Sequence, residues 1–290
     1  MAILNVGSIN IDGFYRIPAI PQPGETISAL DYTETLGGKG LNQSFAVALA
    51  GGKIRHAGAI NRADTFIIEA MSSVGIDCTH VARLDDHPTG RAVVMVASDG
   101  ENAIVLNSGA NHQLPDAEIS SAIAGMSVGD WLLVQNETNA TASAISKARS
   151  AGLKIALAAA PFVASDILPL LPSTDLLMVN EVEYAQLCAA EPSLVSDGSK
   201  TVLITRGSQG AELRSNAKTI TVPAHAVDVV DTTGAGDTFT GYLIAALDAG
   251  EDPERALRLA SAAAAVSVTR NGAAASIPSM AEVTGFLARV

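Results

Sequence analysis

The order of hydrophobic and polar positions along the chain predicts strands that alternate with amphipathic helices. Short apolar runs recur between longer segments whose apolar residues lie three or four positions apart. The expected strands are Ala2–Val6, Ile54–Ile60, Trp131–Gln135, Lys154–Ala158, Leu176–Val179 and Thr201–Thr205. The expected helices include Ala117–Met126, Ala140–Ala151, Glu181–Ala189 and Glu254–Val268. This alternation is typical of an α/β protein whose mostly parallel sheet is covered by helices on both faces.

Two zones depart from this rhythm. Residues 11–36 and 89–108 alternate apolar and polar positions, which predicts strands with one exposed face. Asp99-Gly100 lies between two such runs and is a strong signal for a hairpin turn. We therefore expect a small β sheet that stands off the main body as a lid, inserted into a single α/β domain spanning residues 1–290.

Composition and charge narrow the possible functions. The chain has 290 residues, 48% of them hydrophobic, which is enough for one large domain with a sizeable core. A formal net charge of −12 makes nucleic acid and anionic membrane surfaces poor partners. The first residues lack the basic flank and apolar core of a signal peptide, and no apolar run approaches the roughly 18 residues of a membrane span. We therefore expect a cytoplasmic protein without a membrane partner.

The stretch Asp231–Phe239 carries the most informative chemistry. Small residues end a loop there, and an apolar helical run follows directly. Gly234, Ala235 and Gly236 would then lie at a helix N-terminus, where free backbone N–H groups favour a phosphoryl group. Asp237, in the first turn, would be placed to accept a proton from a substrate hydroxyl. The alternative is a purely structural loop capped by an aspartate.

A second glycine-rich stretch, Gly37–Gln43, also runs into a helical segment. It does not match the phosphate-binding Walker A loop, which needs four residues between its first glycine and a Gly-Lys-Ser/Thr sequence. Lys39 and Asn42 beside close-approach glycines suit a polyhydroxylated ligand better. Asn10 and Asp12 follow the first strand, at the edge of the sheet where α/β proteins bind ligands. Read alone, these two could also be ordinary turn residues.

Taken together, these motifs resemble the ribokinase family of carbohydrate kinases nearly from end to end. In chain order they are Gly7-Ser8-x-Asn10-x-Asp12, Pro23-Gly24-Glu25-Thr26, Gly37-Gly38-Lys39-Gly40-x-Asn42-Gln43, Ser108-Gly109-Ala110-Asn111, Gln135-x-Glu137, Asn180-Glu181-x-Glu183, Leu203-Ile204-Thr205-x-Gly207-Ser208-x-Gly210, Asp231 to Phe239, and Val268-Thr269-Arg270-x-Gly272-Ala273-x-x-Ser276. The resemblance implies a three-layer α/β/α fold with a β-sheet lid. It also implies that the lid closes on the sugar and forms the contact of a homodimer.

The resemblance also implies roles for individual residues. Asp237 would be the catalytic base, with Gly234, Ala235 and Gly236 as an anion hole. The expected sugar-binding residues are Asn10, Asp12, Gly38, Lys39, Asn42, Glu137 and Asp237. The expected nucleotide-binding residues are Asn180, Glu183, Thr205, Gly207, Gly210 and Gly236, with Mg²⁺ bound alongside ATP, while the Ala-rich helix around Ala260 and Ala263 would contact adenine. A K⁺ site would use Asp231, Thr233, Ser267, Arg270, Gly272 and Ser276.

Some of these positions have a simpler interpretation. Asn180-Glu181 is also the pattern of a helix cap with an acidic first turn, and both interpretations can hold together. Asp231, read without the resemblance, would be a turn residue. The implied reaction is transfer of the ATP γ-phosphate to the primary (O5) hydroxyl of D-ribose. The alternatives are a kinase for another small sugar or a nucleoside, and a sugar-binding regulator without turnover.

The chain departs from the family pattern at five places. Asn61 and Ile67 stand where the family has glycine, and Asn61 would be tolerated there because asparagine can adopt left-handed backbone conformations. Ala158 replaces an asparagine, and Arg206 adds a positive charge beside the nucleotide loop. The segment between 191 and 200 is shorter than in a typical member. These changes affect the periphery and the nucleotide half, whereas the predicted sugar contacts remain.

Overall fold

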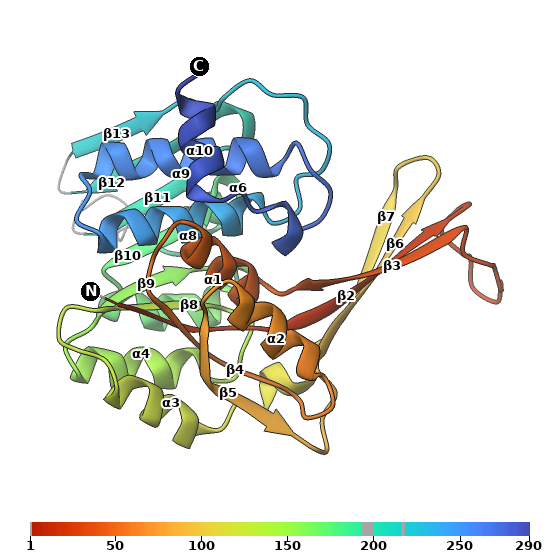
Figure 1. The fold of residues 1–290 in the computed structure, drawn as a ribbon, viewed down its shortest axis with the longest axis horizontal. Helices are drawn as coiled ribbons and strands as arrows, with labels where there is room; N and C mark the ends of the chain where they lie inside the picture. Colours follow the sequence, from red (N-terminus) through yellow and green to blue (C-terminus); the bar gives the residue numbers. More distant parts are fainter. Residues whose placement is uncertain (1, 193–199, 216–217) are drawn as a thin grey trace.

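A nine-stranded sheet forms the centre of the molecule in the computed structural model, which describes residues 2–192, 200–215 and 218–290 (Figure 1). Its strand order is β13-β12-β11-β10-β9-β8-β1-β4-β5. The strands from β11 to β5 pair in parallel, whereas β12 and β13 are antiparallel to their neighbours. The strands are β1 Ile3–Val6, β4 Ile54–Asn61, β5 Asp77–Leu84, β8 Trp131–Gln135, β9 Lys154–Ala158, β10 Leu176–Asn180, β11 Thr201–Thr205, β12 Ala211–Ser215 and β13 Lys218–Val222.

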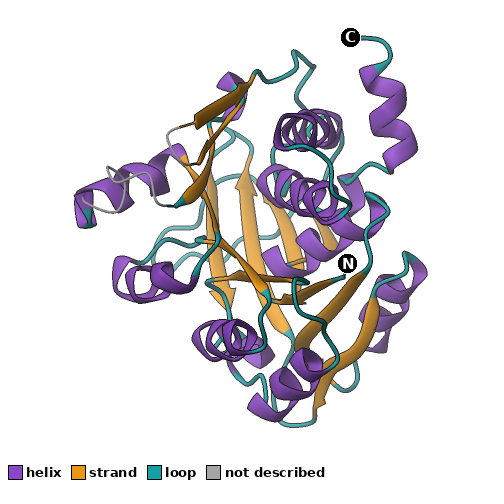
Figure 2. Ribbon diagram, turned by 90° about the vertical axis from the view of Figure 1, so that its left-hand side faces the viewer, coloured by secondary structure: helices purple, strands orange, loops and turns teal. Residues whose placement is uncertain are grey.

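Helices cover both faces of this sheet (Figure 2). Successive side chains of a strand point to opposite faces, and Ile3 and Leu4 of β1 accordingly belong to two different buried clusters. The Ile3 cluster lies under α1 Lys39–Leu49, α2 Thr65–Ser73, α8 Ala235–Asp248, α9 Pro253–Ser267 and α10 Met280–Leu287. The Leu4 cluster lies under α3 Asp116–Ala124, α4 Thr141–Ser150, α5 Ala164–Ile167 and α6 Glu181–Ala190. The predicted three-layer α/β fold is confirmed.

A second sheet of four strands projects from the main body (Figure 1). Its order is β3-β2-β6-β7, and its strands are β2 Asn10–Ile17, β3 Asp31–Gly37, β6 Gly90–Ala97 and β7 Asn102–Asn107. These strands fall in the two zones of alternating pattern. β6 and β7 form an antiparallel hairpin, and Gly100 in its turn has a positive φ of 90°. Because β2 leads out of β1 and β3 leads into α1, the projecting sheet is connected directly to the loops that follow the central strands.

The predicted strands and helices are all present, with ends that differ by at most two residues. Three strands were not predicted, namely β5, β12 and β13. None of the helices in the described part of the chain has the length and apolar character needed to cross a bilayer.

The structure accounts for the two departures in the α2 region. Ile67 is fully buried on α2 and belongs to the same core cluster as Met71, so its larger side chain contributes to packing. Asn61 is the last residue of β4, and its Nδ2 donates to the carbonyl of His87 at 2.9 Å. Because Asn61 is a strand residue, it needs no left-handed backbone there, and its Oδ1 accepts from the Ala63 N–H of the following turn at 3.0 Å. Residues 193–199 of the shortened segment lie outside the described residues.

Candidate active site

The N-termini of α1 and α8 meet at the carboxyl end of the central strands. The two helices approach closely at Gly241, where an added Cβ would lie 2.4 Å from the Cβ of Ala46. A side chain at this position would therefore push the helices apart. The close approach places Asn42 and Gln43, in the first turns of α1, beside Asp237 in the first turn of α8.

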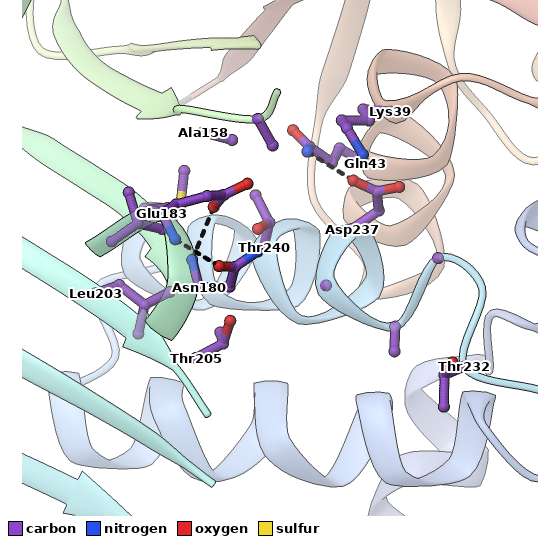
Figure 3. A pocket seen from close by; sticks show the side chains of 16 residues that line it. Lys39, Gln43, Ala158, Asn180, Glu183, Leu203, Thr205, Thr232, Asp237 and Thr240 are labelled. Carbon is purple, nitrogen blue, oxygen red and sulfur yellow. Dashed lines mark hydrogen bonds between the residues drawn. The ribbon is translucent and has the colours of Figure 1, made fainter. Parts of the chain in front are cut away.

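Two side-chain amides hold the Asp237 carboxylate. Asn42 Nδ2 donates to Oδ2 at 3.0 Å. Gln43 Nε2 donates to Oδ1 at 2.9 Å (Figure 3). Each carboxylate oxygen keeps a lone pair for a further donor such as a substrate hydroxyl. The sequence placed Asn42 and Asp237 in the site but gave no role to Gln43, although Gln43 closes the Gly37–Gln43 motif.

A cavity of about 190 Å³ lies over the N-terminus of α8 (Figure 3). Its lining brings together predicted residues from distant parts of the chain, namely Lys39, Asn180, Glu183, Thr205, Gly234, Ala235, Gly236 and Asp237. Gly234 caps the helix with a left-handed backbone, φ 72°, which glycine adopts without strain. The arrangement offers a helix N-terminus to a negatively charged group.

One of the three amides predicted for the anion hole is already engaged. The Ala235 N–H donates to the carbonyl of Thr232 at 3.2 Å. Gly236 and Asp237 belong to the first turn of α8, whose N–H groups have no acceptor within the helix. Compared with the predicted set, the Ala235 N–H is therefore not available to an anion, whereas the N–H groups of Gly236 and Asp237 are.

A second cavity, of about 540 Å³, adjoins the first. Thr205, Thr232, Ala235 and Gly236 line both cavities, so the two meet at the start of α8. The second cavity also contains Gly207 and Gly210 of the predicted nucleotide loop, and its remaining walls are largely apolar side chains. A cavity with a phosphate-binding end and an apolar end suits a nucleotide.

The Ala-rich helix around Ala260 and Ala263, which was predicted to contact adenine, is α9. Ala260 and Ala263 are fully buried in the core. Ser261, Ala264 and Ala265 of the same helix line the second cavity instead. The adenine contacts of α9 therefore stay a prediction, and these three residues are the members of the helix that face the cavity.

The predicted sugar-binding carboxylates lie near the start of α1. The Glu137 carboxylate, just after β8, accepts from Ser8 Oγ at 2.5 Å and from the Lys39 N–H at 3.2 Å. Asn10 and Asp12 lie on β2 and not in a turn, so their reading as ordinary turn residues was wrong. They do not line either cavity, but belong to the projecting sheet beside it.

Burial and mutual repulsion control the charges on this side of the site. Burial and the nearby Glu137 raise the pKa of Asp12 to about 6, against an opposing effect of Lys39. Burial also raises the pKa of Glu137, although the Lys39 ammonium works in the opposite direction. Burial lowers the pKa of Lys39, but the carboxylates of Asp237 and Glu137 outweigh it, so Lys39 is charged. The site therefore holds an ammonium among several carboxylates.

Two buried oxygen atoms on this side have no hydrogen-bond partner in the described part of the chain. They are Asp12 Oδ1 and Asn42 Oδ1. Buried polar atoms of this kind are rare in folded proteins because each leaves its desolvation cost unbalanced. The hydroxyl groups of a polyhydroxylated ligand would supply the missing donors.

At the opposite side of the first cavity, Asn180 and Glu183 form a capping box at the start of α6. The Asn180 side chain accepts from the Glu183 N–H, and the Glu183 carboxylate accepts from the Asn180 N–H, each at 2.8 Å. The helix-cap interpretation is therefore correct, and Glu183 also lines the cavity. Its carboxylate oxygens are the ligand type that Mg²⁺ prefers, so the residues fit a divalent cation bound with a nucleotide.

The predicted K⁺ loops are held together behind the start of α8. Asp231 Oδ1 accepts from the Thr233 N–H at 2.9 Å, and Asp231 Oδ2 accepts from the Gly272 N–H at 2.9 Å. The Arg270 guanidinium pairs with Glu282 at 2.6 Å, which leaves only its main-chain carbonyl for a cation. Ser267 and Ser276 are buried in the same region, each hydroxyl donating to a carbonyl at 2.8 Å. This oxygen-rich pair of loops fits a hard monovalent cation.

The two remaining departures lie near the cavities. Ala158, the last residue of β9, lines the first cavity. Arg206 forms an ion pair with Glu212 of β12 at 2.5 Å, and the same carboxylate also pairs with Arg214. Neither residue alters the Asp237 end of the site.

Comparison with known proteins agrees with this geometry. The model of the pfkB family of carbohydrate kinases matches residues 2–280. A ribokinase from Haemophilus influenzae is 36% identical over 299 residues, covering 97% of this chain and 97% of that protein. The structure of Arabidopsis thaliana ribokinase complexed with ribose and ATP superposes with a TM-score of 0.88 at 30% identity, covering 99% of this chain and 98% of that one.

The ribokinase of Cryptococcus neoformans var. grubii in complex with ADP gives a TM-score of 0.87 at 33% identity, covering 98% of this chain and 99% of that one. These similarities extend over both sheets and both cavities, because nearly the whole chain is aligned. The chain therefore belongs to the pfkB family of carbohydrate kinases and is a phosphotransferase that acts on a hydroxyl group of a sugar.

Proposed function

We propose that the protein is an ATP-dependent ribokinase that transfers the γ-phosphate of ATP to the O5 hydroxyl of D-ribose. The observation that carries the proposal is the position of Asp237. Its carboxylate lies where the α1 residues of the sugar side meet the cavity over the N-terminus of α8. Such a position allows one group to contact the acceptor hydroxyl while the transferring phosphoryl group approaches the helix amides.

In the proposed mechanism, Asp237 accepts the proton of the O5 hydroxyl as that oxygen attacks the γ-phosphorus. Asn42 and Gln43 fix the carboxylate by donating to its two oxygens. The first-turn amides of α8, mainly those of Gly236 and Asp237, stabilise the charge that develops on the phosphoryl oxygens. Mg²⁺ bound with ATP would neutralise further phosphate charge, and Glu183, which lines the same cavity, would provide a carboxylate for the ion or for its water ligands.

The sugar would be held mainly by charged groups at the base of the lid. Asp12 and Glu137 are suited to accept hydrogen bonds from sugar hydroxyls, and Lys39 is suited to donate one. Asn10 completes this set, because its Oδ1 accepts from Asn111 Nδ2 at 2.8 Å and its Nδ2 is suited to donate to a sugar hydroxyl. A lining of this polarity favours a small free sugar over a nucleoside, whose base would need an apolar slot.

We also propose that the lid forms a homodimer contact with a second copy of the chain. On β7, one edge strand of the projecting sheet, Ile104, Val105 and Leu106 are 57%, 60% and 67% exposed, and Tyr32 of β3, at the opposite edge, is 47% exposed. A patch of exposed apolar side chains on a sheet is a frequent interaction surface. Sedimentation of the purified chain tests the proposal, and the mass of a single chain would contradict it.

The location of the protein in the cytoplasm stays a prediction from the sequence.

A sugar panel tests the proposed function. ADP release would be followed with D-ribose, 2-deoxyribose, other pentoses, ketohexoses and nucleosides, at saturating ATP with Mg²⁺ and K⁺. The proposal expects the highest kcat/KM for D-ribose and a product phosphorylated at O5, identified by phosphorus–proton NMR. A higher kcat/KM for another acceptor would reassign the substrate, and sugar binding without any ADP release would indicate a regulator.

A further inference from the structure

A chain of buried polar side chains runs from Asp237 into the core of the protein. Its members are Gln43 and Ser44 of α1, Gln135 of β8, Asn5 of β1 and His56 of β4. All five are at most 1% exposed. Of these five, only Gln43 lines a described cavity. Burying so many polar groups is costly unless they bond to one another, and here each side chain does, although Gln135 Oε1 has no hydrogen-bond partner in the described part of the chain.

The links are short and continuous. Gln43 Nε2 donates to Asp237 at 2.9 Å, and Gln43 Oε1 accepts from Gln135 Nε2 at 2.6 Å. Gln135 Nε2 also donates to Asn5 Oδ1 at 3.0 Å. Asn5 Nδ2 donates to Ser44 Oγ at 2.9 Å, and Ser44 Oγ lies 2.8 Å from His56 Nδ1. The chain of bonds therefore extends unbroken from β4 to the carboxylate on α8.

Two backbone carbonyls fix the direction of every bond, because a carbonyl oxygen can only accept. His56 Nε2 faces the carbonyl of Gly7 at 3.2 Å and must carry the hydrogen. Burial lowers the pKa of His56 to about 4, so the ring is neutral and its Nδ1 accepts. The Ser44 hydroxyl therefore donates to His56 and accepts from Asn5.

The second carbonyl is that of Gly40, which accepts from Asn5 Nδ2 at 2.7 Å. The amide nitrogen of Asn5 therefore faces Gly40 and Ser44, and its oxygen faces Gln135. Gln135 uses the two hydrogens of its Nε2 on Asn5 and Gln43. Gln43 thus has its oxygen turned to Gln135 and only its NH₂ group available for Asp237.

We infer that Gln135 and Asn5 are positioning residues that fix the amide of Gln43, and through it the carboxylate of Asp237. The inference rests on the proposed role of Asp237 as the catalytic base. Without Gln135, the Gln43 amide can rotate and place its oxygen against the carboxylate. The two oxygens repel each other, and the carboxylate loses its fixed orientation toward the acceptor hydroxyl. A displacement of about 1 Å at a reacting group can cost on the order of 100-fold in rate.

Gln135→Met tests the inference because methionine matches glutamine in length and removes only the hydrogen bonds. We expect kcat to fall by about 10-fold to 100-fold, with KM for sugar and for ATP within about twofold of wild type. A merely structural role would lower the melting temperature without this split between kcat and KM. Thr174→Val is the matched control, since Thr174 is also buried and loses one hydrogen bond, to the carbonyl of Leu170, away from both cavities. It should change stability but neither kinetic constant.

Gln43→Met is the second variant and decides the matter if Gln135→Met does not fold. It should lower kcat at least as much, because it removes the donor to Asp237 itself. Adding Gln135→Met to Asp237→Asn should not reduce the residual turnover further, since the network acts only through the carboxylate. Two results would overturn the positioning role of the network but not the role of Asp237. One is a wild-type kcat in a folded Gln135→Met or Gln43→Met variant, and the other is a further 10-fold loss in the double variant. Normal kcat in Asp237→Asn overturns the base role and the network with it.

Discussion

Asn42 and Asp237 are 195 positions apart in the chain, yet Asn42 Nδ2 donates to Asp237 Oδ2 at 3.0 Å. The contact joins the first turn of α1 to the first turn of α8, the two glycine-rich stretches that stand out in the sequence. A predicted sugar-binding residue is therefore a direct neighbour of the predicted base. A movement of α1 together with the lid would also displace the Asp237 carboxylate, because β3 leads into α1 without an intervening element.

Lys39→Ala should raise KM for the sugar far more than KM for ATP. Lys39 lies among the carboxylates of Asp12, Glu137 and Asp237, which is the proposed sugar side. Loss of a hydrogen bond from a charged group should weaken sugar binding by about 1.5–3 kcal/mol. Steady-state kinetics with each substrate varied in turn would measure the effect. Lys147→Ala is the control, because Lys147 pairs with Asp116 on the surface at 2.8 Å, and a larger effect on ATP than on sugar would restore a phosphate-binding role.

The pH dependence of sugar use should report Asp12. Its pKa of about 6 in the free protein means that the carboxyl gains a proton as the pH falls below 6. A protonated carboxyl accepts hydrogen bonds from sugar hydroxyls poorly, so kcat/KM for the sugar should fall on the acidic side. Profiles between pH 5 and 8 would be compared with those of Asp12→Asn, which should have a lower kcat/KM and lack this acidic decline. A wild-type profile that is flat through pH 6 would argue against ionised Asp12 as a sugar ligand.

The same carboxyl should cost stability at neutral pH. Its pKa is about 6 in the folded protein and 3.8 without burial, so the folded state keeps the proton up to a higher pH than the unfolded chain does. The resulting stabilisation is complete below pH 3.8 and is lost as the pH rises through 6. Asp12→Asn should therefore be more stable than wild type at pH 8, by on the order of 2 kcal/mol, and should lose this advantage toward pH 4.5. Thermal melts at the two pH values measure this, and an advantage that does not change with pH would contradict it.

Potassium should activate the enzyme and sodium should do so poorly. Asp231 bonds to Thr233 and Gly272, so a cation held by these two loops would steady the backbone that leads into α8. Loss of one preorganised donor to a developing charge costs roughly 2.7–4 kcal/mol, so partial disorder of this loop should be visible in kcat. Initial rates at fixed ionic strength with potassium, sodium or a bulky organic cation make the comparison. Equal rates in all three would leave Asp231 as a turn residue.

The fold was predictable where the pattern of the sequence follows the physics of burial. Strands such as Trp131–Gln135 are continuous apolar runs because helices cover both of their faces. β12 was missed because Glu212 and Arg214 bond to each other within it, and charged residues in a short segment do not look like a strand. β5 was missed for a related reason, since polar side chains interrupt its pattern.

The candidate site was predictable only where a motif marked it. Asp237, Lys39 and Glu183 belong to glycine-rich or capped helix starts, and the structure places all three around one cavity. Gln135 belongs to the Gln135-x-Glu137 motif but was given no role, and His56 gave no signal, because a polar residue inside an apolar run does not reveal what it bonds to. Their partners come from other strands and helices, and only the folded chain brings them together.

Turnover by Asp237→Asn, measured together with sugar binding, is the most direct test of the account. Asparagine keeps the size of the side chain but cannot accept the proton of the acceptor hydroxyl. We expect kcat with D-ribose to fall by about 10²–10⁴-fold, the usual contribution of a general base, while calorimetry shows ribose binding and thermal melts show a fold close to wild type. A kcat close to wild type, with ribose binding retained, would contradict the role of Asp237 as the base.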